Sequence, residues 1–302
     1  MSSRTILAAV AAAVLPAMLC AEQAVDAHKQ AAANGRVEIE NAAGSIRVIG
    51  WAREEVAVKG KLGRGAEGLQ LTGGSQHTRI EIETSGDGHA VRSELEIHVP
   101  AASRVAIESF SADINVSEVS GDVRAESASG NVTISGAREV EAEAVAGRIE
   151  ISGATSRVRA ESVNGPVTVK GAGGDIEAST VNGLLSVSGA RFERLHLESV
   201  SGDIHFDGEV AAKGSLELNT VSGNVEAAFP ASMAADFAIS TFSGHIQNEL
   251  GPPPRAKNRF TSEQGLEFNT GGGGARIEME SLSGDINLRK QAAGAAQKGT
   301  QR

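Results

Sequence analysis

Apolar and polar residues alternate with a period of two along most of the chain, and this alternation predicts β-strands. Short triplets such as residues 158–160 (Val-Arg-Ala) and 167–169 (Val-Thr-Val) have apolar outer residues and a polar middle residue. Side chains of a strand point alternately to its two faces, so we expect the outer pair inside and the middle residue outside. Two triplets and two turns then make one unit.

A turn motif with an apolar residue, Ser or Asn, and then Gly separates the triplets and recurs along the chain. The repeat glycines are Gly121, Gly130, Gly147, Gly165, Gly183, Gly202, Gly223, Gly244 and Gly284. Their spacings are 9, 17, 18, 18, 19, 21, 21 and 40 residues. Such a period indicates a stacked array rather than a single globular core. We therefore predict an all-β fold, a β-solenoid of about 18–21-residue rungs over residues 103–290.

The residue two positions before each repeat glycine is apolar, and the residue before that is usually Ser or Thr. Stacked rungs turn equivalent positions into columns with a spacing of about 4.8 Å. From their apolar character we expect Val163, Val181 and their equivalents to be buried in the core. We expect the corner glycine to supply a positive φ.

Residues 35–102 alternate in the same way but lack the repeat. We interpret them as an N-terminal β cap, because an open terminal rung would expose edge strands and apolar side chains. Residues 22–34 are polar and Ala-rich, which predicts a linker or a frayed helix, and residues 291–302 have no apolar pattern and are expected to be a disordered tail.

Residues 250–274 interrupt the array with three consecutive prolines and four consecutive glycines, and Leu266 to Phe268 indicate a short strand between them. Proline cannot donate a ladder hydrogen bond, so we expect a mobile flap outside the solenoid wall. Its basic residues Arg255, Lys257 and Arg259 are our candidate contact for an anionic partner, such as an envelope polysaccharide or lipid head groups. The alternative is a solvated decoration.

Residues 1–21 have the features of a secretory signal peptide. Arg4 precedes an apolar run over residues 6–19, which is too short to span a membrane, and cleavage is expected before Glu22. Cys20 raises a lipoprotein alternative, which Leu19 disfavours because lipid attachment favours a small residue before the cysteine. We expect an exported protein with no transmembrane segment after cleavage; periplasm, outer surface and secretion stay open.

The charge and composition restrict the function further. The formal net charge is −10, and the chain has 8 Phe, 1 Trp and no Tyr. An acidic protein lacks the cations that neutralise phosphates, so we expect no nucleic-acid partner. The scarcity of aromatic residues predicts a core of Val, Ile, Ala and Leu. Cys20 is the only cysteine, so no disulfide is expected in the mature chain.

Two groups of residues have the chemistry of metal ligands. Aspartates at or near corners could bind calcium, but the tandem Gly-rich nonapeptide of calcium rolls is missing, so we expect them to bind backbone N–H groups. These aspartates are Asp113, Asp122, Asp203 and Asp285. His196, His205 and Asp207 could hold zinc, but they lack tight ligand spacing. We expect no metal and no cofactor.

A row of glutamates is predicted on the outer side of the strand before the corner. The row consists of Glu141, Glu143, Glu161, Glu177, Glu198, Glu217, Glu278 and Glu280. We favour a solvated face with Arg157, Arg159 and His196 interspersed. The alternative is a weak site for divalent cations or cationic partners.

The chain also resembles a known family. The segment 35–51 (Gly-Arg-Val-Glu-Ile-Glu-Asn to Ile-Gly-Trp), the segment 95–100 (Leu-Glu-Ile-His-Val-Pro) and the Val-Ser-Gly-Asp-Ile array resemble a bacterial family of exported proteins of unknown function that are labelled putative adhesins. The resemblance covers residues 35–290 and implies a Gly-cornered β-helix similar to adhesin-head domains. It transfers no catalytic residue.

The sequence therefore predicts a non-enzymatic, exported cell-envelope protein with an adhesin-like or structural role, and another envelope protein is a further candidate partner. A carbohydrate-active β-helix enzyme, a polysaccharide lyase or hydrolase, is the alternative. Such an enzyme needs a groove with clustered acids or bases and aromatic sugar platforms, for which only Trp51 and the phenylalanines are available.

Overall fold

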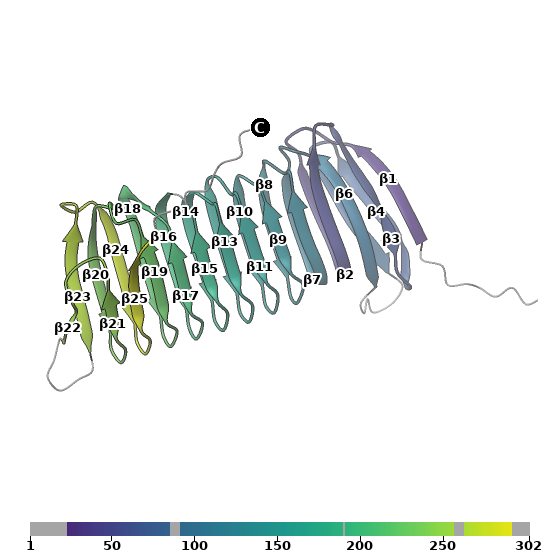
Figure 1. The fold of residues 1–302 in the computed structure, drawn as a ribbon. Helices are drawn as coiled ribbons and strands as arrows, with labels where there is room; N and C mark the ends of the chain where they lie inside the picture. Colours follow the sequence, from purple (N-terminus) through teal and green to yellow (C-terminus); the bar gives the residue numbers. More distant parts are fainter. Residues whose placement is uncertain (1–22, 85–90, 190, 257–262, 292–302) are drawn as a thin grey trace, which may run out of the picture.

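The computed structural model describes residues 23–84, 91–189, 191–256 and 263–291. Within these ranges it contains 25 strands and no helix, stacked into one elongated rack (Figure 1). The all-β solenoid expected from the repeat is confirmed. The signal peptide, the cleavage site with Cys20, the tail beyond residue 291, Lys257 and Arg259 lie outside the described residues.

Each rung places one strand in each of two facing sheets. In spatial order, the first sheet of the repeat region contains β8 (Asp122–Ser127), β10 (Glu139–Ala144), β12 (Arg157–Ser162), β14 (Gly174–Thr180), β16 (Phe192–Ser199), β18 (Val210–Thr220), β24 (Ala275–Ser281) and β20 (Ala235–Thr241). The second contains β9 (Val132–Ser135), β11 (Ile149–Ser152), β13 (Val167–Lys170), β15 (Leu185–Ser188), β17 (Ile204–Asp207), β19 (Val225–Phe229), β25 (Ile286–Lys290) and β21 (Ile246–Asn248). All these pairings are parallel, so equivalent residues stack in columns.

The N-terminal region continues both sheets. Strands β2 (Arg36–Trp51) and β7 (Arg104–Ser117) are long enough to run through the corner from the first sheet into the second. Beyond β2, the first sheet ends in β5 (His77–Thr84) and β4 (Ala66–Gly74), and the second in β6 (Arg92–Pro100), β3 (Glu55–Leu62) and β1 (Gln23–Gln30). Residues 22–34, expected to be a linker, thus contain β1, which pairs antiparallel with β3.

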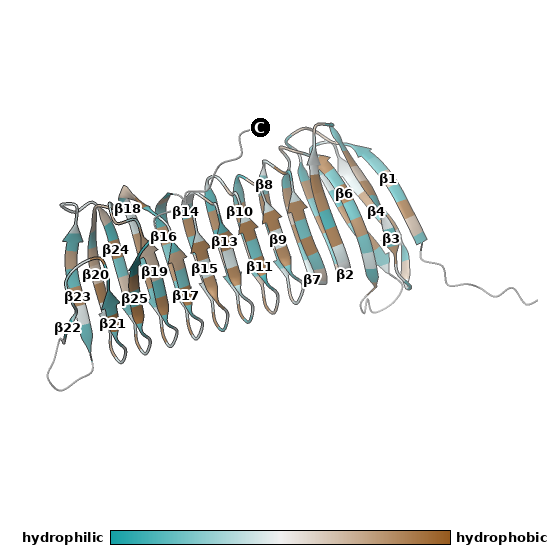
Figure 2. Cartoon of the chain, in the orientation of Figure 1, coloured by the Kyte–Doolittle hydropathy of each residue, from teal (hydrophilic) through white to brown (hydrophobic). Residues whose placement is uncertain are grey.

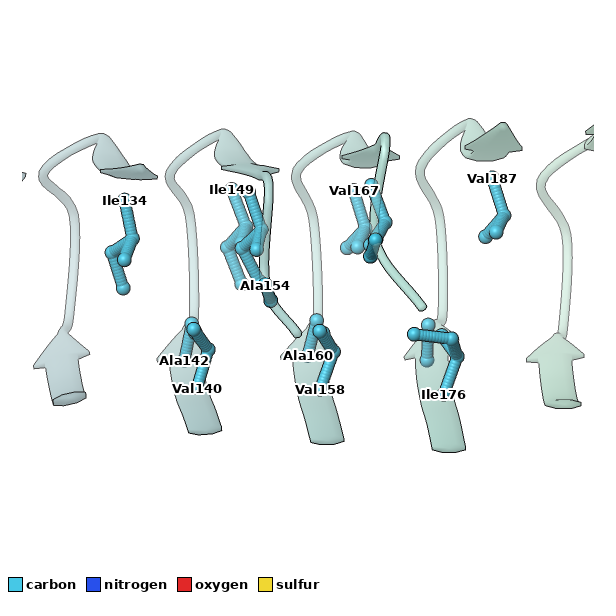
Figure 3. Packing of buried hydrophobic residues seen from close by; sticks show 14 of the residues in the cluster. Ile134, Val140, Ala142, Ile149, Ala154, Val158, Ala160, Val167, Ile176 and Val187 are labelled. Carbon is cyan, nitrogen blue, oxygen red and sulfur yellow. The ribbon is translucent and has the colours of Figure 1, made fainter. Parts of the chain in front are cut away.

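The core lies between the two sheets and is built from small and β-branched side chains. Val158 and Ala160 of β12 are buried and face Val167 and Val169 of β13, whereas Arg159 is exposed. Figure 3 shows Val158 and Ala160 pointing toward Val167 from the opposite layer, and Figure 2 shows the alternation of apolar and polar bands along the strands. The inside and outside positions expected from the triplets are confirmed.

The expected burial of the corner valines is wrong. Val163 is 41% exposed and Val181 is 37% exposed, whereas Ser162 and Thr180 beside them are buried. Strand parity explains this result: Val158, Ala160 and Ser162 point inward, so the next residue, Val163, must point outward. The Ser162 hydroxyl can be buried because its Oγ accepts a hydrogen bond from the Gly165 N–H at 3.0 Å.

The expected role of the corner glycines is also wrong. Within the repeat region, glycines with a positive φ lie at the other edge of the rungs, including Gly136, Gly153 and Gly171, and the corner glycines are not among them. A Cβ built on Gly165 would lie 1.8 Å from the carbonyl oxygen of Gly147 in the preceding rung. Glycine is therefore required by close stacking of one corner on the next.

The spacing of 9 residues between Gly121 and Gly130 is half a rung, and the structure places the two glycines at opposite edges. Gly121 precedes β8 at the edge where Val119 is buried. Gly130 begins the column of corner glycines between the first and second sheets. The first copy of the motif is therefore a different turn with a similar sequence.

The last rung in the sequence is not the last rung in space. Strand β24 pairs with β18 on one side and with β20 on the other, so residues 275–290 are inserted between two rungs that precede them in the chain. Within 250–274, β23 (Gln264–Thr270) pairs antiparallel with β20, β22 (Arg255–Ala256) pairs with β23, and Leu266 is buried. The flap expected outside the wall thus contains a strand that covers the edge of the terminal rung.

Candidate interaction surface

An exposed column of apolar side chains follows the corner of the solenoid, and we call it the corner ridge. It consists of Phe110, Ala128, Val145, Val163, Val181, Val200, Val221, Leu282 and Phe242, in spatial order. All except Ala128 are more than a third exposed, with Phe110 at 70% and Phe242 at 55%. Eight steps of about 4.8 Å make the ridge about 38 Å long.

Backbone and hydroxyl hydrogen bonds hold the ridge in a fixed line. The N–H of Val163 donates to the carbonyl of Ala144 at 3.1 Å, and that of Val181 donates to Ser162 at 3.2 Å. Behind the ridge, Thr180 Oγ1 donates to the Gly165 carbonyl at 3.2 Å and accepts from the Gly183 N–H at 3.1 Å. The corner turns that carry the ridge are therefore held in an ordered ladder of hydrogen bonds.

Carboxylates line the flank of the ridge on the first sheet. The column next to the ridge, which we call the acidic column, reads Glu40, Glu108, Glu126, Glu143, Glu161, Ser179, Glu198, Asn219, Glu280 and Ser240. Seven of its ten positions are glutamates. The opposite flank carries small neutral groups, such as Asn164 and Asn182, which are joined by a hydrogen bond of 2.9 Å.

Four basic residues, Arg79, Arg124, Arg159 and His196, lie one column farther from the ridge, and Arg79 binds Glu40. Arg124 binds Glu126 at 2.7 Å and Glu141 at 2.6 Å. The hydrogen bond to Glu126, followed by the charge of Glu141, raises the pKa of Arg124 above its ordinary value. In the same column, Arg159 lies 2.6 Å from Glu161.

The charge of Glu161 is the main cause of the raised pKa of Arg159, with Glu177 contributing further. His196 lies 2.9 Å from Glu198 and 3.4 Å from Glu217. The solvated face with interspersed cations, expected from the glutamate pattern, is what the structure contains. Exposed pairs of this kind contribute little to stability.

Two shallow grooves follow the ridge on its acidic side. The groove near the N-terminal end is bounded by Phe110, Val145, Val163 and Val181 of the ridge together with Ile82 of the cap region. The groove near the C-terminal end is bounded by four other ridge residues, and its acidic residues are Glu198, Glu217, Glu263, Glu278 and Glu280. Acidic and apolar groups thus accompany each other along the whole ridge.

The corner aspartates bind backbone N–H groups, as expected from turn chemistry. Asp113 accepts from the Asn131 N–H at 2.9 Å, Asp203 from Asn224 at 2.8 Å and Asp285 from His245 at 2.8 Å. Each bond joins one rung to the next. Asp122 differs because it accepts two hydrogen bonds of 2.7 Å from Arg138.

The structure separates the residues considered for zinc. His196 lies on β16 in the first sheet, whereas His205 and Asp207 lie on β17 in the second, so they face opposite sides of the solenoid. Among the described residues, no group of three or more His, Cys, Asp or Glu side chains is arranged to hold a metal ion. Arg255, from the basic candidate site, is exposed on β22.

At the edge remote from the ridge, Asp175 lies between two arginines. Arg194 Nε donates to Asp175 Oδ1 at 3.1 Å, and Arg157 Nη2 is 3.9 Å from Asp175 Oδ2. The hydrogen bond from Arg194 lowers the pKa of Asp175, against a smaller opposing effect of burial. A lowered pKa stabilises the fold above the unfolded value of about 3.9, and this stabilisation is lost as the pH falls through the folded-state pKa.

We therefore expect Asp175→Asn to lower the stability at pH 7 by less than about 1 kcal/mol, because the pair is partly exposed. At about pH 2 the carboxyl of the parent chain is increasingly protonated, so the two proteins should unfold at more similar temperatures. Thermal unfolding of both proteins at the two pH values checks this expectation. A stability difference that stays constant with pH would contradict the assigned ion pair.

Comparison with known proteins agrees with this architecture. Residues 175–289 match the family model Toastrack DUF4097. The Toastrack match covers the C-terminal rungs, including the inserted rung and β23, and it confirms the resemblance drawn from the sequence. No curated protein sequence matches the chain significantly.

One solved structure extends the likeness in fold to most of the chain. A putative adhesin from Parabacteroides distasonis matches with a TM-score of 0.54 at 10% identity, over 89% of this chain and 98% of that one. A putative adhesin from Bacteroides fragilis covers the same shares at 10% identity with a TM-score of 0.44. At this identity the Parabacteroides structure supports the fold alone.

The structure also bears on membrane association. Among the residues it describes, no helix has the length and the apolar character needed to cross a bilayer.

Proposed function

We propose that the chain is an exported, non-enzymatic binding scaffold of the cell envelope with an adhesin-like role. The observation that carries the proposal is the corner ridge with its acidic column, where an apolar corner side chain recurs in nine rungs and a glutamate stands beside it in six of them. Repeat proteins use extended surfaces of this kind to bind partners. The likeness to proteins labelled putative adhesins supports the same proposal.

Retention and turnover measured on the same samples test this proposal. The purified chain is immobilised and exposed to envelope polysaccharides, anionic lipid vesicles and solubilised envelope proteins, and bound material is quantified. New reducing ends and unsaturated sugar products are assayed in parallel. The proposal expects retention without product, whereas product formed with ordinary turnover would support the carbohydrate-active enzyme instead.

The basic segment around Arg255 is a second candidate contact because Arg255 is exposed at the C-terminal end of the rack. Here the partner would be anionic, an envelope polysaccharide or lipid head groups. The variant Arg255→Ala with Lys257→Ala and Arg259→Ala should reduce retention of anionic fractions and leave retention of envelope proteins unchanged. If the variant retains the anionic fractions as well as the parent chain does, the basic segment is not the contact.

Export is tested on the native protein. Mass spectrometry of the mature chain from the producing cells should give Glu22 as the N-terminal residue. An intact Met1, or a lipid on Cys20, would contradict the proposed processing.

A further inference from the structure

We propose that the corner ridge and the acidic column form a docking site for a basic amphipathic helix of a partner polypeptide. The inference rests on the proposed function as a binding scaffold and names the chemistry of its ligand. Three features carry it: the exposed apolar line, the one-sided charge and the spacing of the rungs.

The apolar line is continuous, which distinguishes it from scattered surface hydrophobics. Every rung from β7 to β20 contributes one apolar corner side chain, and backbone hydrogen bonds join each corner to the next. The largest side chains, Phe110, Phe242 and Leu282, lie at or near the two ends and are at least 54% exposed. Contiguous exposed apolar surface on an ordered element marks an interaction site.

The charge beside this line has a single sign. The two grooves together are lined by eleven glutamates, and no Lys or Arg of the described residues lines them. Arg79, Arg124, Arg159 and His196 offset part of this charge from the next column. At the C-terminal end, no ion pair within the described part of the chain involves Glu278 or Glu280 of β24. A ligand with cations along one side of an apolar stripe complements this arrangement.

The rung spacing favours a helix over an extended chain. Apolar groups on the ridge repeat every 4.8 Å or so, close to the 5.4 Å pitch of an α-helix. An extended chain along the same axis repeats its side chains on one face at about 6.6–6.8 Å and loses register within two rungs. An amphipathic helix places an apolar stripe on the ridge and its flanking Lys or Arg residues on the acidic column.

A second copy of this chain fits the ridge less well. Each copy carries a formal net charge of −10, so association of two copies meets repulsion. A basic helix instead meets attraction that falls with salt. The salt dependence of binding therefore separates these occupants.

The probe is a fluorescent 18-residue Leu/Lys peptide with leucines on one helical stripe. Two matched peptides are used as controls: a scrambled Leu/Lys sequence without the stripe, and a Leu/Glu peptide with the stripe but the opposite charge. Anisotropy titrations with the full chain at about 0.05 M and 0.5 M salt give the dissociation constants. We expect the Leu/Lys helix to bind at least about tenfold more tightly than either control at low salt, and to weaken with salt.

Variants of the exposed side chains locate the site without altering the core. Val163→Ser, Val181→Ser and Val200→Ser combined should weaken Leu/Lys binding at least about tenfold, and Glu161→Gln with Glu198→Gln should weaken it about threefold and reduce the salt effect. Leu184→Ser is the matched control, because Leu184 is 41% exposed but lies outside the ridge. Unfolding curves verify that each variant is folded.

Equal affinity for the Leu/Lys and Leu/Glu peptides would overturn the inference, as would an unchanged affinity in the ridge triple variant. Dimerisation that the ridge triple variant abolishes would also overturn it, because a second copy would then be the occupant. The scaffold function fails separately, if the parent chain retains no envelope fraction. If envelope fractions are retained equally by the parent chain and the ridge variant, the scaffold stands and the ridge inference fails.

Discussion

Gly165→Ala is expected to destabilise the protein by about 3 kcal/mol, although it adds a single methyl group. The new Cβ would lie 1.8 Å from the Gly147 carbonyl oxygen and 2.6 Å from its carbon. Both atoms belong to backbone, and the rungs on either side are fixed by parallel ladders, so the corner cannot move without breaking the hydrogen bonds from the Asn164 N–H to Val145 and from the Asn182 N–H to Val163. Urea unfolding of the parent chain and the variant measures the difference.

Substitutions at two further glycines separate the stability cost of close stacking from the cost of an unfavourable backbone conformation. Gly171 has φ of +60° and Gly74 has no positive φ, and a Cβ at either would meet no atom within 4 Å. Gly171→Ala should therefore cost about 1–2 kcal/mol from the left-handed backbone alone, and Gly74→Ala less than about 0.5 kcal/mol. If Gly165→Ala costs no more than Gly171→Ala, stacking of the corners is not what demands glycine.

Ile277→Asp is expected to cost about 3–5 kcal/mol, since it places an unpaired charge in the core. Ile277 is fully buried on β24, and β24 is the strand that joins β20 to the rest of the first sheet. Because rungs contact only their neighbours, the loss should be local. Hydrogen exchange should show β20, β21 and β23 losing protection first while β10–β13 keep theirs.

Glu278→Gln is the matched control for this variant, because Glu278 is the next residue on the same strand and points outward. Its effect on stability should stay within about 0.5 kcal/mol. Loss of protection spread evenly over all rungs in Ile277→Asp would contradict the quasi-one-dimensional array. Undiminished protection of β20 would contradict the inserted position of β24.

The period and the strand parity were sufficient to predict the array and the core positions. Repeats of 17–21 residues predicted stacked rungs, and alternation in residues 158–160 predicted which side chains point inward. The same parity, extended by three residues, places Ser162 inside and Val163 outside. The prediction failed there because the apolar character of the column was given more weight than its position, and the ridge was missed for that reason.

Other features depend on contacts between rungs that no local pattern encodes. Residues 275–290 are inserted between two earlier rungs because β24 pairs with both β18 and β20. The sequence of this rung has the same pattern as the other rungs, so it does not reveal the inserted position. The short strand indicated around Leu266 to Phe268 is confirmed as β23, but its antiparallel pairing with β20 depends on contacts that the local sequence does not encode. Phe268 stacks on Phe237 with ring centroids 4.6 Å apart, which extends a chain of aromatic contacts from Phe192 to the end of the rack.

Thiol accessibility at the corner tests the exposed ridge most directly. In a chain with Cys20→Ser, single cysteines are introduced at Val163, which the structure exposes, and at Val167, which it buries completely. The labelling rate with a maleimide is measured under native conditions and relative to the unfolded chain. We expect Val163→Cys to react within about tenfold of the unfolded rate, and Val167→Cys to be protected by about 1000-fold or more, reacting only through local opening. Equal protection of the two thiols, or faster reaction at position 167, would contradict the exposed ridge.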